Sequence, residues 1–360
     1  MDKVRLEEVS EKAGSNLAQK DIEDLTGIYP IYGASGYIGN ADFYHQDKEY
    51  VAVVKDGAGV GRTMFLPAKS SVIGTLQYII PNGRVLPKYL YYAVKNMKLA
   101  KYYTGATIPH IYYKDYKNEM FWLPNMFEQR EVVLILEKIE KIIDEQKQEL
   151  LDLENLIKSR FVEMFGDPVS NSFGLPEAIL PELGEFGRGV SKHRPRNDPK
   201  LLGGEYPLIQ TGDVANAGLY ITSYNSTYSE LGLKQSKMWD KGTLCITIAA
   251  NIAKTAILEF DACFPDSVVG FIANEKTSNI FIHYWFSFFQ AILESQAPES
   301  AQKNINLKIL SELKVIVPEK EKQNEFEAFV HQVDKSKLAV VERLEKIEYL
   351  KAALMQKYFG

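Results

Sequence analysis

The chain has 360 residues, of which 46% are hydrophobic and 25% charged, and its formal net charge is −5 at pH 7. This composition predicts two globular units with hydrophobic cores and excludes wholesale disorder. No apolar run reaches the roughly 18–20 residues that a membrane span needs. The first residues do not form a signal peptide. We therefore expect a cytoplasmic protein without a membrane segment.

Signatures of catalysis are weak. Cys245 and Cys263 are too few for a disulfide framework or a four-ligand zinc site, so we expect buried free thiols. The five histidines lack metal-ligand spacing, and no Gly-x-Ser-x-Gly elbow is present. Residues 56–62 are glycine-rich but lack the Gly-Lys-Ser/Thr ending of a phosphate-binding loop. The sequence therefore favours a binding protein with no metal site and no cofactor on this chain.

Residues 1–122 are the first predicted domain. Short runs of β-branched and aromatic residues alternate here with glycine, asparagine, aspartate and proline, which predicts a β-rich unit. A helix is expected near its end, at residues 87–100.

Residues 123–166 predict one long helix. Pro124 lies where a strand should stop and a helix can start, and Gly166 followed by Pro168 ends the helix. Roughly 38 helical residues would make a rod of about 55 Å. Apolar residues recur at steps of three and four, as in a two-helix coiled coil. The residues expected at the helix interface are Val132, Ile135, Ile139, Ile142, Leu150, Leu153 and Ile157.

Residues 167–316 predict a second β-rich domain, with a helix at residues 279–294, and residues 317–360 predict a second long helix. The same helical spacing of apolar residues occurs there. Its expected interface residues are Phe326, Val330, Val333, Val340, Leu344, Ile347 and Leu354.

The second half of the chain repeats the first. Residues 317–360 align without a gap on residues 123–166 at an offset of 194, which places Gln323 on Gln129. Fainter matches precede the helices. They pair Ile305 with Ile111, residues 206–208 with 29–31, residues 246–255 with 53–63, and residues 267–270 with 71–74.

The order of the elements restricts their geometry. The second domain follows the first helix and precedes the second, so it can touch both helices only if they are antiparallel. We therefore predict an α+β fold: two β-rich heads joined by two long antiparallel helices that form a coiled coil with pseudo-two-fold symmetry.

Two similar heads on a spacer suit an extended, symmetric target such as double-stranded DNA, whose half-sites lie about 34 Å apart for dimeric readers. A net-acidic chain is a poor nonspecific polyanion binder, so local groups matter. Arg, Lys, Asn and Gln read base edges, and Ser, Thr, Tyr and Lys hold phosphates. For each candidate, a structural role in a turn or a solvated loop is the open alternative. The candidates are Lys55, Arg62, Thr107, His110, Lys114, Lys192, His193, Arg194, Arg196, Gln210, Thr211, Asn251, Lys254, Lys303 and Asn304.

Three stretches carry a resemblance to a known family. Residues 160–168 read Arg-Phe-Val-Glu-Met-Phe-Gly-Asp-Pro, and residues 105–111 read Gly-Ala-Thr-Ile-Pro-His-Ile before Leu123 and Pro124. Residues 300–307, Ser-Ala-Gln-Lys-Asn-Ile-Asn-Leu, precede Val317 and Pro318 in the second copy. In this order, and duplicated, they make the chain resemble the specificity subunits of type I restriction-modification systems over essentially its whole length.

The resemblance implies that each head is a target-recognition domain for one half of a bipartite DNA sequence. It also implies that the helices set the gap and dock two modification subunits, which bind S-adenosylmethionine and methylate adenine. Restriction subunits, which use ATP and Mg, join to translocate and cleave DNA. The specificity subunit of that family performs no chemistry. In agreement, residues 167–169 are not the Asn/Asp-Pro-Pro-Tyr signature of an adenine methyltransferase.

Two alternatives belong to other classes. A noncatalytic coiled-coil scaffold would bind protein partners through its β-rich heads. A fused restriction enzyme that both reads and cuts DNA is disfavoured, because no length remains for a nuclease or methyltransferase domain.

Overall fold

The computed structural model describes residues 2–22, 25–105, 109–296 and 305–360. The chain divides into two compact units: unit 1 is Met1–Glu149 with Val340–Gly360, and unit 2 is Leu150–Ala339. The division passes through both long helices, so each helix contributes one segment to each unit. No helix among the described residues is long and apolar enough to cross a lipid bilayer.

The sheets of unit 1 are small and mostly antiparallel. The larger sheet has the order β2 (Ser10–Gly14), β8 (Leu76–Pro81), β5 (Tyr50–Val54) and β6 (Thr63–Leu66). A second sheet has the order β4 (Gly36–Ala41), β3 (Tyr29–Gly33) and β7 (Ser71–Val72), and β1 (Asp2–Arg5) pairs with β9 (Met120–Leu123). All of β5 is buried, as its valine-rich sequence favours. The short helices are α1 (Leu6–Val9), η1 (Gln19–Asp21), α2 (Pro87–Asn96), η2 (Leu99–Tyr102) and α3 (Tyr113–Tyr116).

Unit 2 has the same strand order, with one further edge strand on each of the two sheets. Its first sheet is β11 (Gly184–Arg188), β19 (Val268–Ala273), β16 (Leu244–Thr247), β17 (Thr255–Leu258) and the added β13 (Tyr220–Ile221). Its second sheet is β14 (Ser226–Tyr228), β12 (Leu202–Leu208), β18 (Ala262–Cys263) and the added β15 (Met238–Trp239), and β10 (Glu177–Ile179) pairs with β20 (Lys314–Ile316). The shorter helices are α5 (Leu180–Leu183), η3 (Pro199–Leu201), α6 (Thr211–Asn216), α7 (Glu230–Lys234), α8 (Asn279–Gln296) and α9 (Leu307–Ser311).

The turn after the central strand is built in the same way in both units. In unit 1, Val54 N–H donates to the Arg62 carbonyl at 2.9 Å, and Gly61 N–H donates to the Val54 carbonyl at 2.8 Å. In unit 2, Thr247 exchanges the same pair of bonds with Lys254 and Ala253, each at 2.9 Å. The predicted match of residues 53–63 with residues 246–255 is therefore confirmed.

A second predicted match, of residues 71–74 with residues 267–270, is wrong. Lys55 N–H donates to the Thr75 carbonyl at 2.9 Å, and the corresponding Ile248 N–H donates to the Ser267 carbonyl at 3.0 Å. Ser267 is therefore the counterpart of Thr75 and not of Ser71. The two short Ser-Val motifs look alike, but sheet register fixes the equivalence, and they occupy different places in the ladders.

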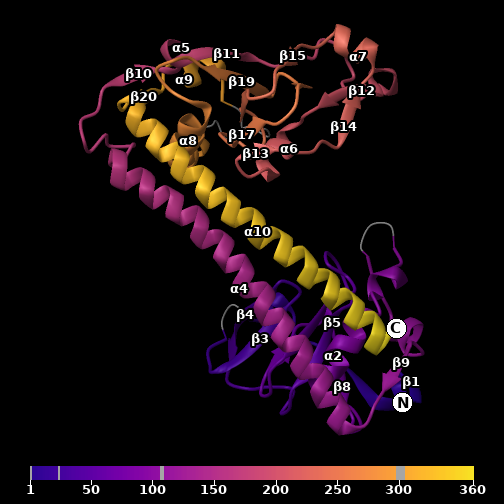
Figure 1. Cartoon of the computed structure of the whole chain (residues 1–360). Coiled ribbons are helices and arrows are strands. Elements are labelled where there is room, and N and C mark those ends of the chain that lie inside the picture. Colours follow the sequence, from indigo (N-terminus) through magenta and orange to yellow (C-terminus); the bar gives the residue numbers. More distant parts are fainter. Residues whose placement is uncertain (1, 23–24, 106–108, 297–304) are drawn as a thin grey trace. The chain divides into compact units, whose positions relative to one another are not determined.

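The two long helices, α4 (Met126–Phe165) and α10 (Lys320–Phe359), run antiparallel within each unit (Figure 1). In unit 1, Lys351 Nζ lies 2.7 Å from Glu140 Oε1, and Arg343 lies 3.2 Å from Glu149. In unit 2, Lys337 Nζ lies 2.6 Å from Glu154 Oε2. Residue numbers on one helix fall as those on the other rise, as an antiparallel pair requires.

The first long helix starts later than residue 123. Leu123 still ends β9, and the helix begins at Met126. Asn125 and Glu128 bond reciprocally: Glu128 N–H donates to Asn125 Oδ1 at 3.0 Å, and Asn125 N–H donates to Glu128 Oε2 at 3.2 Å. This capping box satisfies donors that the first turn leaves free and so fixes the start of the helix.

The predicted phase of the first helix needs one correction. Ile135 and Ile142 are 38% and 41% exposed, whereas the adjacent Leu136 and Ile143 are buried. At both places two apolar residues are adjacent in sequence, and the second of each pair is the one that lies on the buried stripe with Val132 and Ile139. The other predicted interface residues that are buried are Ile157, Phe326, Val330, Val333 and Val340, and those that are half-buried are Leu150, Leu153, Leu344, Ile347 and Leu354.

A buried glutamine fixes the start of each long helix to its β-rich head. Gln129 Nε2 donates to the carbonyls of Pro124 (3.0 Å) and Arg84 (3.2 Å), and its Oε1 accepts from Leu86 N–H at 2.8 Å. Gln323 Nε2 donates to the carbonyls of Pro318 and Lys276, each at 2.9 Å, and its Oε1 accepts from Thr277 Oγ1 at 3.1 Å. The two glutamines that align in the sequence repeat therefore make equivalent hydrogen bonds to backbone carbonyls in the structure.

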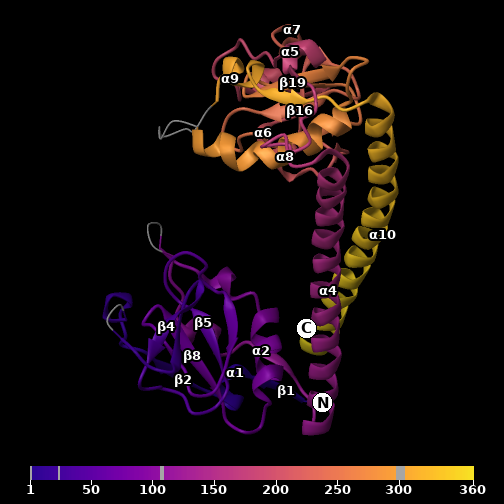
Figure 2. The ribbon, with the colours of Figure 1, turned by 90° about the vertical axis from the view of Figure 1, so that its left-hand side faces the viewer.

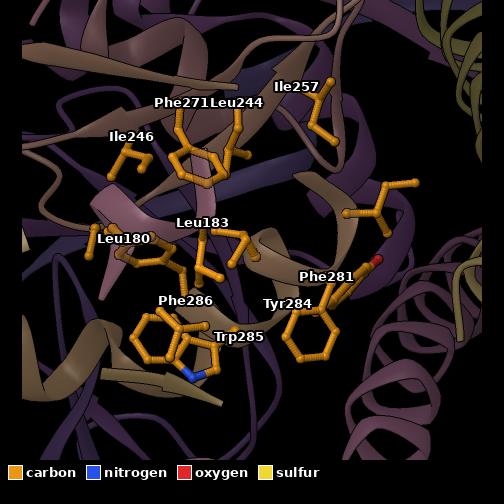
Figure 3. Close-up of a cluster of buried hydrophobic side chains, with 14 of the residues drawn as sticks. Leu180, Leu183, Leu244, Ile246, Ile257, Phe271, Phe281, Tyr284, Trp285 and Phe286 are labelled. Atoms are coloured by element: carbon orange, nitrogen blue, oxygen red, sulfur yellow. The ribbon is translucent and has the colours of Figure 1, made fainter. Parts of the chain in front are cut away.

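The core of unit 2 lies between its first sheet and α8. Figure 3 shows Phe281, Tyr284 and Trp285 of α8 below Leu244 and Phe271 of the sheet. Phe161 and Phe165 of α4 join the same cluster. In unit 1, α2 packs similarly against β5 and α4 (Figure 2). The free thiols of Cys245 and Cys263 are buried, and burial raises the pKa of both.

Candidate nucleic-acid interface

Three candidate residues of unit 1 lie around one hollow. Lys55, His110 and Lys114 line it together with Lys12, Gln77, Ile111, Tyr112 and Tyr113, and its volume is about 380 Å³. Lys12 lies on the edge strand β2 and Gln77 on β8, and neither was predicted from the sequence. We call this feature the lysine hollow.

Backbone hydrogen bonds hold the walls of the lysine hollow together. Ile111 N–H donates to the Lys55 carbonyl at 2.9 Å, and Gly57 N–H donates to the Pro109 carbonyl at 2.9 Å. His110 and Thr104 exchange a further pair of backbone bonds at 2.8 and 2.9 Å. The loop after β5 and residues 109–114 are therefore one fixed surface, although they are far apart in sequence.

The lysine hollow is basic. Among the described residues that line it, none carries a carboxylate. The nearby carboxylate of Asp56 contacts His110 Nδ1 and lies 3.9 Å from Lys55 Nζ. The ammonium groups of Lys12 and Lys114 lie over the rings of Tyr113 and Tyr112, at 5.6 and 5.1 Å from the ring centroids. Such contacts orient a lysine and leave its N–H donors free for an anion.

Arg62 is not part of this hollow. Its guanidinium donates to the Ala34 carbonyl at 2.9 Å. The preceding turn needs glycine at position 61, because φ there is +83° and a Cβ would approach the backbone N of Ala100 to 2.3 Å. Close backbone packing therefore requires glycine in this turn, whose sequence lacks the ending of a phosphate-binding loop.

Three candidates of unit 2 line another hollow, of about 280 Å³. Arg196, Gln210 and Thr211 meet there with Asn197 and Ser267. The Gln210 side chain is exposed at the start of α6. Its backbone N–H donates to Asp213 Oδ2 at 2.8 Å, and Asn225 Nδ2 donates to the other oxygen of Asp213, also at 2.8 Å. The amide side chains of Gln210 and Asn197, which are suited to reading base edges, therefore line this hollow, and Asn197 was not predicted from the sequence.

The basic loop at residues 192–196 is largely paired with acidic side chains. Arg194 and Arg196 both contact Asp266, the former at 3.6 Å, and His193 Nε2 lies 3.1 Å from Asp198 Oδ2. The Lys200 N–H and the His193 ring hold the pKa of Asp198 below its usual range. The N–H groups of Lys192 and His193 donate to Gln235 Oε1 at 2.7 and 3.0 Å. This loop is therefore ordered by its own contacts.

Of the remaining candidates, two lie in a turn that does not line either hollow, and three fall outside the described residues. Asn251 and Lys254 belong to the turn between β16 and β17, where Lys254 N–H donates to Thr247 Oγ1 at 3.0 Å. The Asn251 side chain is exposed. Thr107, Lys303 and Asn304 lie outside the described residues.

Comparison with known proteins identifies the family. The model of the type I restriction modification DNA specificity domain matches residues 1–155 and 180–349. A chain of Methanocaldococcus jannaschii, named as the MjaX type I restriction enzyme specificity subunit, is 22% identical over 286 residues, which are 76% of this chain and 67% of that relative. The Haemophilus influenzae specificity subunit S.HindORF215P is 21% identical over 359 residues, which are 94% of this chain and 92% of the relative.

Solved structures show the same fold. The S subunit of the type I restriction-modification system from M. genitalium superposes with a TM-score of 0.59 at 16% identity, covering 100% of this chain and 96% of that one. A chain from a study of complex assembly and conformational transition of the type I R-M system gives 0.58 at 16% identity, with coverages of 99% and 97%. The matches favour DNA recognition over the protein-binding scaffold. The chain belongs to the type I restriction-modification DNA specificity family and is a DNA sequence-specificity subunit.

Proposed function

We propose that the chain recognises a bipartite double-stranded DNA sequence, with residues 1–122 reading one half and residues 167–316 reading the other. The observation that carries the proposal is the repeated fold. The same strand order, the same turn and the same glutamine contact occur once in each unit. Two similar readers in one chain suit two half-sites on one duplex.

The two hollows suggest how each head would contact DNA. We call residues 1–122 head 1 and residues 167–316 head 2. In head 1, Lys55 and Lys114 would hold phosphates, because an ammonium group is a point charge with several donors. In head 2, Gln210, with Asn197 beside it, would face base edges, because amides form paired hydrogen bonds with bases. Arg196 lines the same hollow, and its guanidinium would have to exchange its contact with Asp266 for one with the DNA. Asn251, Lys254 and Arg62 would flank these sites from the neighbouring turns.

The long helices would set the gap between the half-sites and dock partner subunits. Their antiparallel segments leave Leu134, Leu151 and Tyr349 51%, 59% and 78% exposed, which is apolar surface that a partner can cover. The expected partners are two modification subunits that bind S-adenosylmethionine, joined by restriction subunits that use ATP and Mg. The chain itself would be noncatalytic and would supply the sequence specificity of the complex.

Footprinting of the chain in complex with its modification subunits tests the proposal. We expect protection of two short half-sites about one helical turn, roughly 34 Å, apart, and no protection of a duplex in which both halves are scrambled. Methylation of adenine should require the modification subunits. Equal affinity for every duplex sequence, with the partners present, would contradict DNA specificity.

A further inference from the structure

The lysine hollow has a counterpart in unit 2 that is filled by apolar side chains. Ile305 N–H donates to the Ile248 carbonyl at 2.9 Å, as Ile111 N–H does to the Lys55 carbonyl. Ile248 therefore occupies the place of Lys55. Ile248 is 1% exposed and belongs to the core of unit 2.

Sheet register extends the comparison to the other walls of the hollow. Lys12 of β2 pairs with Ile79 of β8 in unit 1. In the equivalent strand pair of unit 2, Phe186 of β11 pairs with Phe271 of β19. Gln77 of β8 pairs with Val53 of β5, and in unit 2 Val269 of β19 pairs with Ile246 of β16. Phe186 and Val269 thus replace Lys12 and Gln77, and both pack in the core of unit 2. The same place in the fold is therefore a basic surface hollow in head 1 and part of the apolar core in head 2.

The lysines of the hollow come from separate elements. Lys12 lies on the edge strand β2, Lys55 follows the buried strand β5, and Lys114 lies in α3. Lysines from three elements thus line one hollow, and among the ion pairs of the described residues Asp56 is the carboxylate that lies near one of them, 3.9 Å from Lys55 Nζ. Like charges on one surface repel, and a bound anion would offset that repulsion, which favours an anion site. The rigid backbone connections of Lys55 and Ile111 mean that little ordering would be needed on binding.

We propose that the lysine hollow of head 1 binds one backbone phosphate of the DNA, through Lys12, Lys55 and Lys114, and that head 2 has no equivalent site. The inference rests on the proposed function, since the phosphate belongs to the recognised duplex. Lysine favours a phosphate over a base edge, because its ammonium group lacks the planar fork that reads guanine bidentately. The site would therefore set the register of head 1 on the duplex without reading its sequence.

The salt dependence of DNA binding tests this proposal. We would measure the dissociation constant of the chain with its modification subunits by fluorescence anisotropy, between about 50 and 200 mM salt. The variants are K12Q, K55Q, K114Q and the triple variant, and the probes are the target duplex and a duplex with both halves scrambled. For the triple variant we expect a slope of log K against log salt that is shallower by about 1, and affinity lower by about tenfold near 0.1 M salt. The fold loss of affinity should be the same for the target duplex and the scrambled duplex.

Matched variants provide the controls. K308Q changes the counterpart of Lys114, which lies in α9, is exposed and pairs with Glu312 at 3.7 Å, and it should leave the slope unchanged. K12R keeps the charge and should keep the slope. Variants are compared only after gel filtration with the modification subunits shows that the complex forms.

The outcomes separate this inference from the proposed function. An unchanged slope in the triple variant with target preference intact overturns the phosphate site and leaves the proposed function standing. Relaxed sequence preference at the first half-site alone would make these lysines base readers, which also overturns it. Loss of modification-subunit binding by the triple variant in the gel-filtration step, in the absence of DNA, would assign the hollow to an acidic protein segment and overturn the phosphate site. A wild-type complex with no sequence preference contradicts the proposed function itself.

Discussion

The start of each long helix is held by the same contact, but the middle of each helix is not. Gln129 and Gln323 bond equivalent backbone groups in units 1 and 2. Further along, Glu140 of α4 accepts from Tyr92 Oη at 2.7 Å and pairs with Lys351 at 2.7 Å. Asp334, its counterpart on α10, is half-buried, and its Oδ2 has no hydrogen-bond partner among the described residues.

Two substitutions explain the difference in the middle of the helices. The offset of 194 places Ile157 where Lys351 stands in the other copy, so the facing helix supplies no cation to Asp334. The cation near Asp334 is instead Lys337 of the same helix, whose Nζ lies 3.6 Å from Asp334 Oδ1. Aspartate is also one methylene shorter than glutamate. The equivalent glutamine contacts pair Arg84 with Lys276, an offset of 192 in this part of the chain, and so pair Tyr92 with Tyr284. The Tyr284 hydroxyl is buried without a partner among the described residues. The glutamine contact satisfies backbone groups that every copy of the fold must bury, whereas a side-chain pair can be exchanged for apolar packing.

Removing the glutamines should have the largest effect on stability. Gln129→Ala leaves the Leu86 N–H and two carbonyls without their buried partner. Gln323→Ala leaves the Thr277 hydroxyl and two carbonyls without theirs in unit 2. We expect each to lower the free energy of unfolding of its own unit by about 2–4 kcal/mol. Urea unfolding gives the loss, and hydrogen exchange should quicken around residues 84–96 for the first variant and residues 276–290 for the second.

Gln332→Ala is the matched control, because Gln332 is exposed on α10. It should change stability by less than about 0.5 kcal/mol. Equal exchange in both units for either buried-glutamine variant would show that the contact does not act locally in its own unit.

Replacing the diverged carboxylates should give smaller effects of opposite sign. Glu140→Gln leaves the half-buried Lys351 without its charge partner and should cost about 1–2 kcal/mol at pH 7. Asp334→Asn removes a carboxylate that burial destabilises, while Lys337 keeps its pair with Glu154, so we expect stability unchanged or slightly higher. Both values follow from urea unfolding. A larger loss for Asp334→Asn than for Glu140→Gln would contradict the comparison.

The pH dependence of these variants has a defined sign. Burial opposes ionisation of Glu140, but hydrogen bonds from Lys351 and Tyr92 outweigh it and hold the pKa below the usual 4.5. Its stabilisation is present above pH 4.5 and is lost as pH falls through the lowered pKa. Burial raises the pKa of Asp334 above 3.8, so its ionisation penalty is relieved as pH falls through that raised value. The difference between the two variants should therefore shrink in acid.

The sequence predicts the repeat because duplication preserves spacing. Gln129 with Gln323, and Ile111 with Ile305, fall into register at one offset, and the hydrogen bonds confirm these pairs. The helix phase was wrong at Ile135 and Ile142, because two adjacent apolar residues satisfy the same spacing and only packing selects one of them. The match of residues 71–74 with residues 267–270 was wrong for a similar reason, since the register of a sheet ladder is not visible in sequence.

The candidate site was harder to predict than the fold. The lysine hollow brings Lys12 beside Lys114, about a hundred residues later in the chain, and no local pattern marks such a meeting. The loop at residues 192–196 has the densest positive charge in sequence, yet Asp266 and Asp198 pair with it in the structure. The density of positive charge along the sequence therefore points to the loop at residues 192–196, whose charges are largely paired, and misses the lysine hollow, whose lysines come from distant segments.

Exchange of one head tests the central claim most directly. Residues 1–122 would be replaced by the corresponding head of another family member, and methylated adenines would be mapped by long-read sequencing in cells that express the complex. If each head reads its own half-site, one half of the methylated sequence changes while the other half and the gap stay the same. Continued methylation in which both halves change, or neither does, would contradict recognition of the target by two independent heads.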